Sequence, residues 1–344
     1  MSLTDLEAEV APVGAEPTRA IQGRTPWQLA WGRLRRDKVA ISSAVIIVLI
    51  ILTAILAPVL TAWFGDDPTR TNTNTGLSPD GLPLGPSAEH LLGTDQLGRD
   101  MFSRAIYGAR VSLLVGLLST MFATIVGVTI GLLAGYYGGW LDTVISRVIE
   151  IVLSFPYLIV ALVVAATIGP SMTMVIVVIT FFSFSAMARI VRGQVISIKA
   201  KEYVEAARSL GASNLRIMAI DILPNLLAPV IVIASLLIPQ AIVFESTLTF
   251  LGAGVDIRIP SWGGMLAEST QFYRVAWWYL FVPGGLLLLT TLVFNLLGDG
   301  VRDALDPRSE RALAPVGHQT DGGKTGGGKT DGSKTGGADT EAGE

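Results

Sequence analysis

The side chains that could do chemistry are sparse in this sequence, which has no cysteine and two histidines among 344 residues. His90, Asp95 and Asp100 form the most suggestive grouping of metal-ligand types. A metal site needs three or four converging ligands held by a further layer of hydrogen bonds. The spacing of these three residues does not supply such a set, so we expect no metal ion and no cofactor.

A second candidate for chemistry lies near the end of the chain. The run G-K-T-G-G-G-K-T from Gly323 to Thr330 matches the pattern of a phosphate-binding loop letter for letter. That loop binds phosphate only where a strand precedes it and a helix follows it. Glycine-rich sequence flanks the match on both sides, which is typical of low-complexity coil. We therefore expect no nucleotide binding here and no catalytic residue in the chain.

Composition indicates a membrane protein. Half of the chain is hydrophobic (51%) and only 15% is charged, far from the usage of soluble domains. Apolar runs long enough to cross about 30 Å of hydrocarbon predict six transmembrane helices in an all-α fold. We place them at residues 39–64, 112–136, 145–168, 172–190, 225–244 and 277–297. The net charge of −3 and the lack of a basic stripe indicate no role with nucleic acid.

These spans divide the chain into segments. We expect a cytoplasmic segment with an interfacial helix at 1–38, the first span at 39–64 and an extracytoplasmic loop at 65–111. A core of five spans follows at 112–298 and includes a polar loop at 199–224. The tail at 299–344 is expected to be disordered from about residue 313. Most of the 25 lysines and arginines then lie on the side of the N-terminus, which predicts that both termini are cytoplasmic.

The polar loop predicts a helical elbow between two spans. Apolar residues at i, i+3, i+4 and i+7 spacing predict one helix ending at Gly211, which can adopt a left-handed conformation. Ser213 can cap a second helix, on which Leu215, Met218 and Ile222 would share a face, and Pro224 ends this helix or begins the next segment. Such an apolar edge can occupy a groove of a partner, although an amphipathic loop lying on lipid headgroups explains the pattern equally well.

Two features of the spans themselves bear on function. Gly127, Gly131 and Gly135 recur every four residues, a spacing that lets helices approach closely, within this chain or against a second subunit. Glu245 ends an apolar stretch, and an acid at a helix centre costs roughly 2.5–3.5 kcal/mol on the insertion scale, so it must face protein or water. It lines the outer part of a candidate translocation cavity, or it is a structural acid that fixes the outer loop.

Several motifs resemble one known family. Residues Glu205, Ala206, Ala207, Gly211, Ile222 and Pro224 are similar to the "EAA" loop of membrane subunits of binding-protein-dependent ABC importers. The segments Leu92–Asp95, Gly98–Asp100 and Ser103–Arg104 resemble a hallmark of the peptide and nickel branch of that family, in particular its C-type subunit. Two further segments, Pro260–Leu266 and Asn295–Arg308, also match, so the resemblance extends from about Trp27 to Arg308.

The resemblance implies a type I importer permease of the plasma membrane that transports dipeptides or oligopeptides, with nickel complexes as an alternative substrate. The elbow, including Leu215, would be the coupling helix that contacts an ATPase. The implied partners are a homologous B-type permease, two cytoplasmic ATPase subunits and an extracytoplasmic binding protein. The alternative from another class is an ion-coupled secondary transporter or channel. Buried charge pairs at the middle of the spans and inverted repeats would favour that alternative, and the sequence indicates neither.

Overall fold

The computed structural model describes residues 26–256 and 258–306. The phosphate-loop match and the tail from about residue 313 lie outside these residues. The described part is helical, with two isolated β-bridges in its loops and no strand. The helices of the first half are α1 (Pro26–Leu34), α2 (Lys38–Ile55), α3 (Ala57–Phe64), α4 (Met101–Tyr137), α5 (Gly139–Ser154), α6 (Tyr157–Ile168) and α7 (Met172–Lys199).

The second half contains α8 (Glu202–Ser209), α9 (Asn214–Arg216), the π-helix η1 (Ile217–Ile222), α10 (Leu223–Phe250), α11 (Trp262–Ser269) and α12 (Trp277–Leu305). Five helical runs within the described residues are long and apolar enough to cross a membrane. They are α2, α4, α7, the continuous run of α9, η1 and α10, and α12, and the pair α5 and α6 supplies a sixth if it counts as one broken span.

Two of the predicted spans are each divided between two helices. The span predicted at 39–64 is α2 alone, because Leu56 interrupts the helix and Pro58 lies in the first turn of the separate helix α3. The span predicted at 145–168 is the pair α5 and α6, which are bent by 80°. Helix α5 ends at Phe155, whose backbone is extended, because the following Pro156 lacks the N–H that would continue the helix. Helix α6 begins after Pro156.

The other spans are longer than predicted. The loop predicted at 65–111 ends at Asp100, whose side chain accepts a hydrogen bond of 2.8 Å from the backbone N–H of Ser103 and so begins α4. Helices α7, α10 and α12 likewise continue beyond the predicted ends of their spans. The sequence therefore locates the apolar centre of each helix better than its polar ends.

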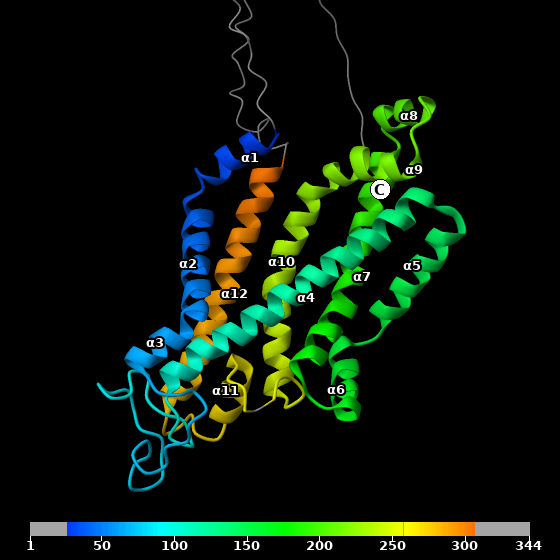
Figure 1. Ribbon diagram of the computed structural model, residues 1–344. Helices are drawn as coiled ribbons and strands as arrows, with labels where there is room; N and C mark the ends of the chain where they lie inside the picture. The colour runs from blue at the N-terminus through cyan, green and yellow to red at the C-terminus, as the bar shows by residue number, and fades with distance from the viewer. Residues whose placement is uncertain (1–25, 257, 307–344) are drawn as a thin grey trace, which may run out of the picture. The chain divides into compact units, whose positions relative to one another are not determined.

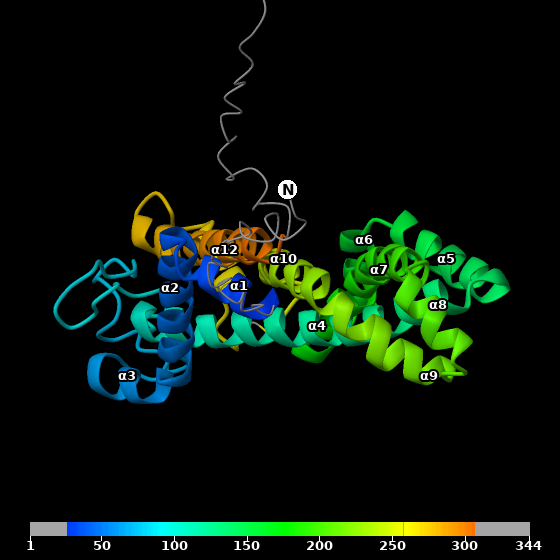
Figure 2. The same ribbon diagram turned by 90° about the horizontal axis from the view of Figure 1, so that it is seen from above.

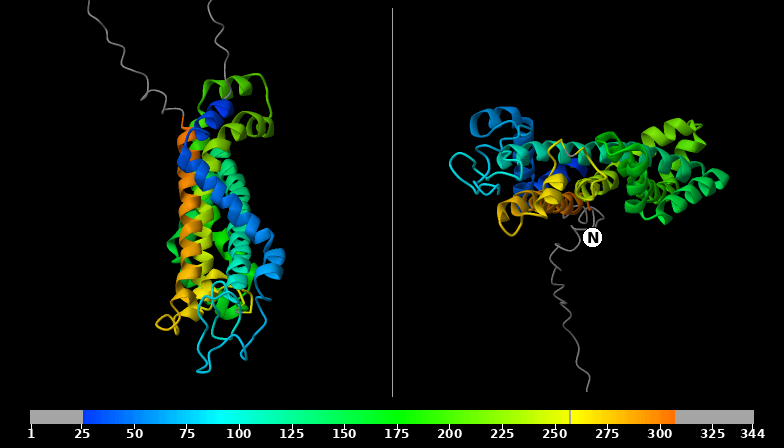
Figure 3. Two further views of the ribbon diagram at one scale, coloured as in Figure 1. Left: turned by 90° about the vertical axis from the view of Figure 1, so that its left-hand side faces the viewer. Right: turned by 90° about the horizontal axis from the view of Figure 1, so that it is seen from below.

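Helix α4 organises the packing, because α7, α10 and α2 all contact it. Seen from above, it crosses from α2 on one side to α5 on the other (Figure 2). Helix α12 packs between α10 and α2, and the side view shows α10 and α12 next to each other (Figure 3). Buried clusters around Trp262 and Met187 fill the spaces between these helices.

The two ends of this helical arrangement differ. Helices α8 and α9 lie at one end, together with α1 and the C-terminal end of α12 (Figure 1). Helices α3 and α11 and the loop before α4 lie at the other end (Figure 1). The predicted elbow and the predicted outer loop are thus on opposite sides of the apolar helices.

Candidate functional site

The elbow has the predicted break at Gly211. Its φ of +83° is a conformation that only glycine adopts readily. The N–H of Gly211 donates to the carbonyl of Arg208 at 3.0 Å, and the N–H of Ala212 donates to the carbonyl of Ala207 at 3.1 Å. This pair of bonds is the Schellman ending of an α-helix. The Ser213 hydroxyl then accepts from the N–H of Arg216, so the predicted second cap is also present.

The face predicted for the second helix is wrong. Leu215 is 74% exposed, whereas Met218 is 4% exposed and Ile222 is completely buried. The π-helical hydrogen bonding of η1 changes the number of residues per turn, so positions i and i+7 no longer share a side. Ile222 therefore supports the elbow from inside the protein, and Pro224 lies in the first turn of α10.

Buried contacts fix the elbow to the helices beneath it. Val204 and Ile217 are both fully buried in a cluster that includes residues of α7 and α10. The hydroxyl of Tyr136, at the end of α4, donates to the side-chain carbonyl of Asn214 at 2.8 Å. The Lys199 ammonium at the end of α7 donates to the carbonyl of Tyr136 at 2.5 Å. A displacement of the elbow is thus linked directly to the ends of α4 and α7.

The outer surface of the elbow carries large apolar side chains among exposed charged ones such as Arg208. Tyr203 is 46% exposed, Leu210 is 88% exposed and Ile220 is 60% exposed, in addition to Leu215. The sequence did not predict the exposure of Ile220. In a regular α-helix Ile222 would face outward and Ile220 would not. Of the triplet, Glu205 and Ala206 are exposed and Ala207 is half-buried. Because they lie at the end of the long apolar helices, these exposed side chains form a candidate binding surface.

The three spaced glycines lie against α7 of the same chain. A Cβ atom at Gly127 would lie 2.6 Å from the Cβ of Met187, and one at Gly131 would lie 2.6 Å from the carbonyl oxygen of Ala188. A Cβ at Gly135 would lie 2.8 Å from the Cβ of Val195. No other residue type fits at these distances, so this stripe serves packing within the chain.

Glu245 lies in packed protein between α10 and α4. Its side chain is 0% exposed, and it accepts hydrogen bonds from the hydroxyls of Ser112 at 2.8 Å, Thr249 at 3.0 Å and Ser246 at 3.3 Å. It does not line either of the cavities beside α10 that are described below. This position favours the structural alternative over the expectation that Glu245 faces the translocation cavity.

A buried ionic network, which the sequence reasoning did not identify, joins the loop before α4 to α11. The Asp95 carboxylate contacts the guanidinium groups of Arg99 at 2.5 Å and Arg104 at 3.0 Å. Glu268 accepts from Arg104 at 2.9 Å and from the Tyr279 hydroxyl at 2.6 Å. Burial alone would lower the pKa of Arg99, but Asp95 and Glu268 raise it above its ordinary value, so the group is charged. The one signal in the sequence is that Glu268 is the single acid in α11.

The residues first considered as metal ligands make other contacts instead. His90 contacts Asp100 at 3.4 Å, while Asp95 belongs to the ionic network. The 26–306 range, residue 257 excepted, contains no cluster of three or more histidine or acidic side chains placed to hold a metal ion. At the surface of α5, Arg147 and Glu150 form an ion pair at 2.7 Å.

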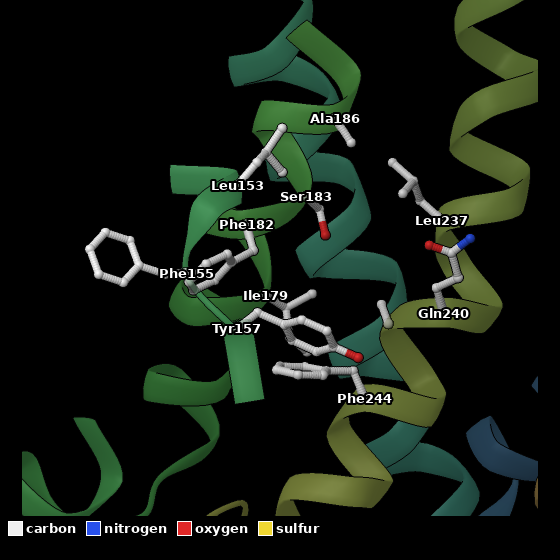
Figure 4. A pocket seen from close by; sticks show the side chains of 11 residues that line it. Leu153, Phe155, Tyr157, Ile179, Phe182, Ser183, Ala186, Leu237, Gln240 and Phe244 are labelled. Carbon is white, nitrogen blue, oxygen red and sulfur yellow. The ribbon is translucent and has the colours of Figure 1, made fainter. Parts of the chain in front are cut away.

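A cavity of about 260 Å³ lies where α5 bends into α6 (Figure 4). Helices α7 and α10 form its other walls. Ser183 of α7 and Gln240 of α10 lie on opposite sides of the space (Figure 4). Beside it, the rings of Tyr157 of α6 and Phe244 of α10 contact each other at a centroid distance of 4.4 Å, tilted by 43°. None of the lining residues is charged.

Comparison with known proteins gives two family matches and close relatives. Residues 127–311 match the model described as binding-protein-dependent transport system inner membrane component, and residues 25–79 match the N-terminal TM domain of oligopeptide transport permease C. The chain is 44% identical over 284 residues to the dipeptide transport system permease protein DppC of Alkalihalophilus pseudofirmus. The matched region covers 83% of this chain and 90% of that protein. The chain is 40% identical over 288 residues to the oligopeptide transport system permease protein OppC of Escherichia coli strain K12, covering 84% and 93% respectively.

Among solved structures, the chain resembles a chain of the MetNI methionine ABC transporter in an inward-facing conformation. The TM-score is 0.51 at 19% identity, and the match covers 60% of this chain and 98% of that chain. At this identity the similarity concerns the fold, which is that of a type I ABC importer permease.

Proposed function

Because this chain belongs to the family of binding-protein-dependent transport system inner membrane components, we propose that it forms half of the membrane pathway of an ATP-driven peptide importer. The chain is a multi-pass membrane permease subunit and not an enzyme, since ATP is hydrolysed in this family by separate ATPase subunits. This membership overturns the alternative of an ion-coupled secondary transporter or channel.

The observation that carries the coupling role is the exposed apolar surface of a rigidly anchored elbow. Leu210 and Leu215 project from it, while Val204 and Ile217 are buried beneath it. A surface that is apolar outside and tightly packed inside can transmit a force without deforming. We infer that a cleft of an ATPase receives this surface, and that closure of the ATPase upon ATP binding displaces the elbow and, through Asn214 and Tyr136, α4.

The remaining partners and the orientation follow from the same proposal. A homologous B-type permease would complete the pathway, two ATPases would bind at the elbow end, and an extracytoplasmic binding protein would deliver the substrate at the opposite end. The elbow end is then cytoplasmic, as are both termini, because α1 and the C-terminal end of α12 lie at that end (Figure 1). Dipeptides or oligopeptides are the proposed substrates, by analogy with the relatives named DppC and OppC.

Crosslinking tests the coupling role directly, because the chain has no native cysteine. In the assembled complex, Leu210→Cys and Leu215→Cys should each form a crosslink to an ATPase subunit carrying a single cysteine in its cleft. The control is Trp63→Cys, which is equally accessible at 77% exposure but lies at the opposite end on α3. Crosslinking at Trp63, or none at both elbow positions in a complex that hydrolyses ATP, would contradict the proposed orientation.

A further inference from the structure

The cavity at the bend between α5 and α6 continues into a second one. The second cavity, of about 330 Å³, shares Tyr157, Gln240 and Phe244 with the first and extends from α10 to α12. Its further lining includes Thr247 and Asn295. The two cavities therefore form one groove, hereafter the α10 groove, which follows α10 on both sides of Gln240.

Three polar side chains face the α10 groove without a partner. The hydroxyls of Tyr157 and Ser183 and the amide of Gln240 make no hydrogen bond to any other residue within the described part of the chain. By contrast, Thr247 and Asn295 are bonded to carbonyls of their own helices, at 2.8 Å to Val243 and 2.9 Å to Thr291. Two of the unpartnered groups, Tyr157 and Gln240, thus lie where the two cavities meet, and Ser183 lies in the first cavity.

The environment of Gln240 makes lipid an unfavourable neighbour. Gln240 lies in the apolar run of α10, directly after Pro239, and its side chain is exposed. A primary amide transferred from water to hydrocarbon without a hydrogen bond loses several kcal/mol. Proline also leaves a helix carbonyl without its usual donor, and such backbone is tolerated at membrane depth where it adjoins a protein-lined or water-filled space. The amide therefore requires a polar companion that this chain does not provide.

We propose that the α10 groove holds the main chain of the transported peptide, with Gln240, Tyr157 and Ser183 as the hydrogen-bonding groups. This inference deepens the proposed function and rests on it. An amide can both donate to and accept from a peptide group, and the hydroxyls can do the same. The aromatic rings of Phe182 and Phe244 supply apolar contact for side chains. A carboxylate, thiolate or imidazole is missing from this lining, so the groove suits a peptide better than a bare nickel ion.

The absence of charge in the lining has a consequence for selectivity. A pathway must bind its cargo strongly enough for entry and weakly enough for release. A fixed charge would retain peptides of the opposite charge and repel those of the same charge. Neutral groups directed at the main chain instead treat cationic, anionic and neutral peptides alike.

Uptake by the complete importer in proteoliposomes tests the assignment. Gln240→Leu should lower the maximal uptake of neutral, cationic and anionic peptides by a similar factor of about three to ten, the loss expected for one hydrogen bond. The matched control is Gln194→Leu on α7, since Gln194 is also exposed but lines neither cavity, and it should transport normally. A peptide methylated on its amide nitrogens should be transported more slowly by the native protein, and Gln240→Leu should reduce its uptake less. Native rates in Gln240→Leu for all peptides would overturn the proposal.

A second measurement avoids dependence on transport rates. Gln240→Cys should react with a water-soluble thiol reagent in the assembled importer, and a transported peptide should slow that reaction. Leu288→Cys on α12, 70% exposed and outside the groove, should react slowly and show no protection. Failure of Gln240→Cys to react would mean that the partner permease or lipid covers the groove, which overturns this inference while leaving peptide import by the native complex intact. If the native complex itself imports no peptide, the proposed function fails first.

Discussion

One guanidinium nitrogen of Arg99, Nη2, lies 3.1 Å from each carboxylate oxygen of Glu268, a residue 169 positions further along the chain. This pair joins the loop before α4 to α11, and both side chains are buried at less than a tenth of their exposed area. Asp95 and Arg104 complete the network with equal numbers of positive and negative charges. The end of the protein opposite the elbow is therefore held by charges that compensate one another within low-dielectric surroundings.

Removing one member of this network should destabilise the folded protein. Glu268→Ala leaves Asp95 as the one remaining acid beside the buried guanidinium groups of Arg99 and Arg104. One buried positive charge is then uncompensated, which destabilises proteins by about 3–5 kcal/mol. The control is Glu150→Ala, which breaks the exposed Arg147 pair and should change stability by less than about 1 kcal/mol. Thermal unfolding of both variants in detergent measures the difference. Equal melting temperatures would show that water already reaches the network.

The contact of α4 with α7 should tolerate no side chain at its centre. Gly131→Ala would place a Cβ 2.6 Å from the backbone oxygen of Ala188, so the helices must separate, at a cost of about 1–3 kcal/mol. Gly193→Ala on α7 is the matched control, because a Cβ there meets nothing within 4 Å. We expect a lower yield of assembled complex and a lower melting temperature for the first variant alone. If both variants behave like the native protein, the α4–α7 distance is looser than the structure indicates.

Features that depend on local sequence were predictable. The positive φ of Gly211, the cap at Ser213 and the close approach at Gly131 each follow from residue type and spacing. The apolar centre of each membrane helix follows from composition over about 20 residues.

Features that depend on distant residues were not. Glu268 acquires its role from arginines more than 160 positions away, and Gln240 acquires its role from the bend between α5 and α6. The reversed positions of Ile220 and Ile222 follow from a π-helix, whose hydrogen bonding cannot be read from apolar periodicity. The helix break before Pro58 was readable in principle, but the continuous hydrophobicity around it concealed the change of direction.

Altering the break in the elbow should uncouple transport without unfolding the protein. Gly211 has φ +83° and open space around its Cβ position, so Gly211→Val introduces backbone strain of roughly 1–2 kcal/mol without a clash. The helix ending would be displaced, and with it Leu210 and Leu215. We expect reduced ATPase association and reduced uptake at nearly unchanged expression, measured by co-purification and transport.

A valine at another glycine of positive φ provides the control for Gly211→Val. Gly252 has φ +77° and equally open surroundings, but it follows α10 at the other end of the protein. Gly252→Val should retain the bound ATPase. Full substrate-stimulated ATP hydrolysis by a Gly211→Val complex would argue against coupling through the elbow.

Glu245 should contribute to the stability of the protein and should not affect the selection between cationic and neutral peptides. Its two oxygens accept hydrogen bonds from the hydroxyls of Ser112, Ser246 and Thr249, and no solvent reaches the side chain. Glu245→Gln preserves the size of the side chain and an acceptor oxygen, so we expect assembly and uptake near native levels for cationic and neutral peptides alike. Glu245→Leu removes every acceptor and leaves buried hydroxyls unpaired, at about 1–3 kcal/mol for each group that finds no other partner. Thermal stability in detergent and paired uptake of lysine-containing and alanine-containing peptides distinguish the alternatives. A selective loss of cationic peptide transport in Glu245→Gln would show that the acid contacts substrate in another state of the importer, and the structural role assigned to it would have to be abandoned.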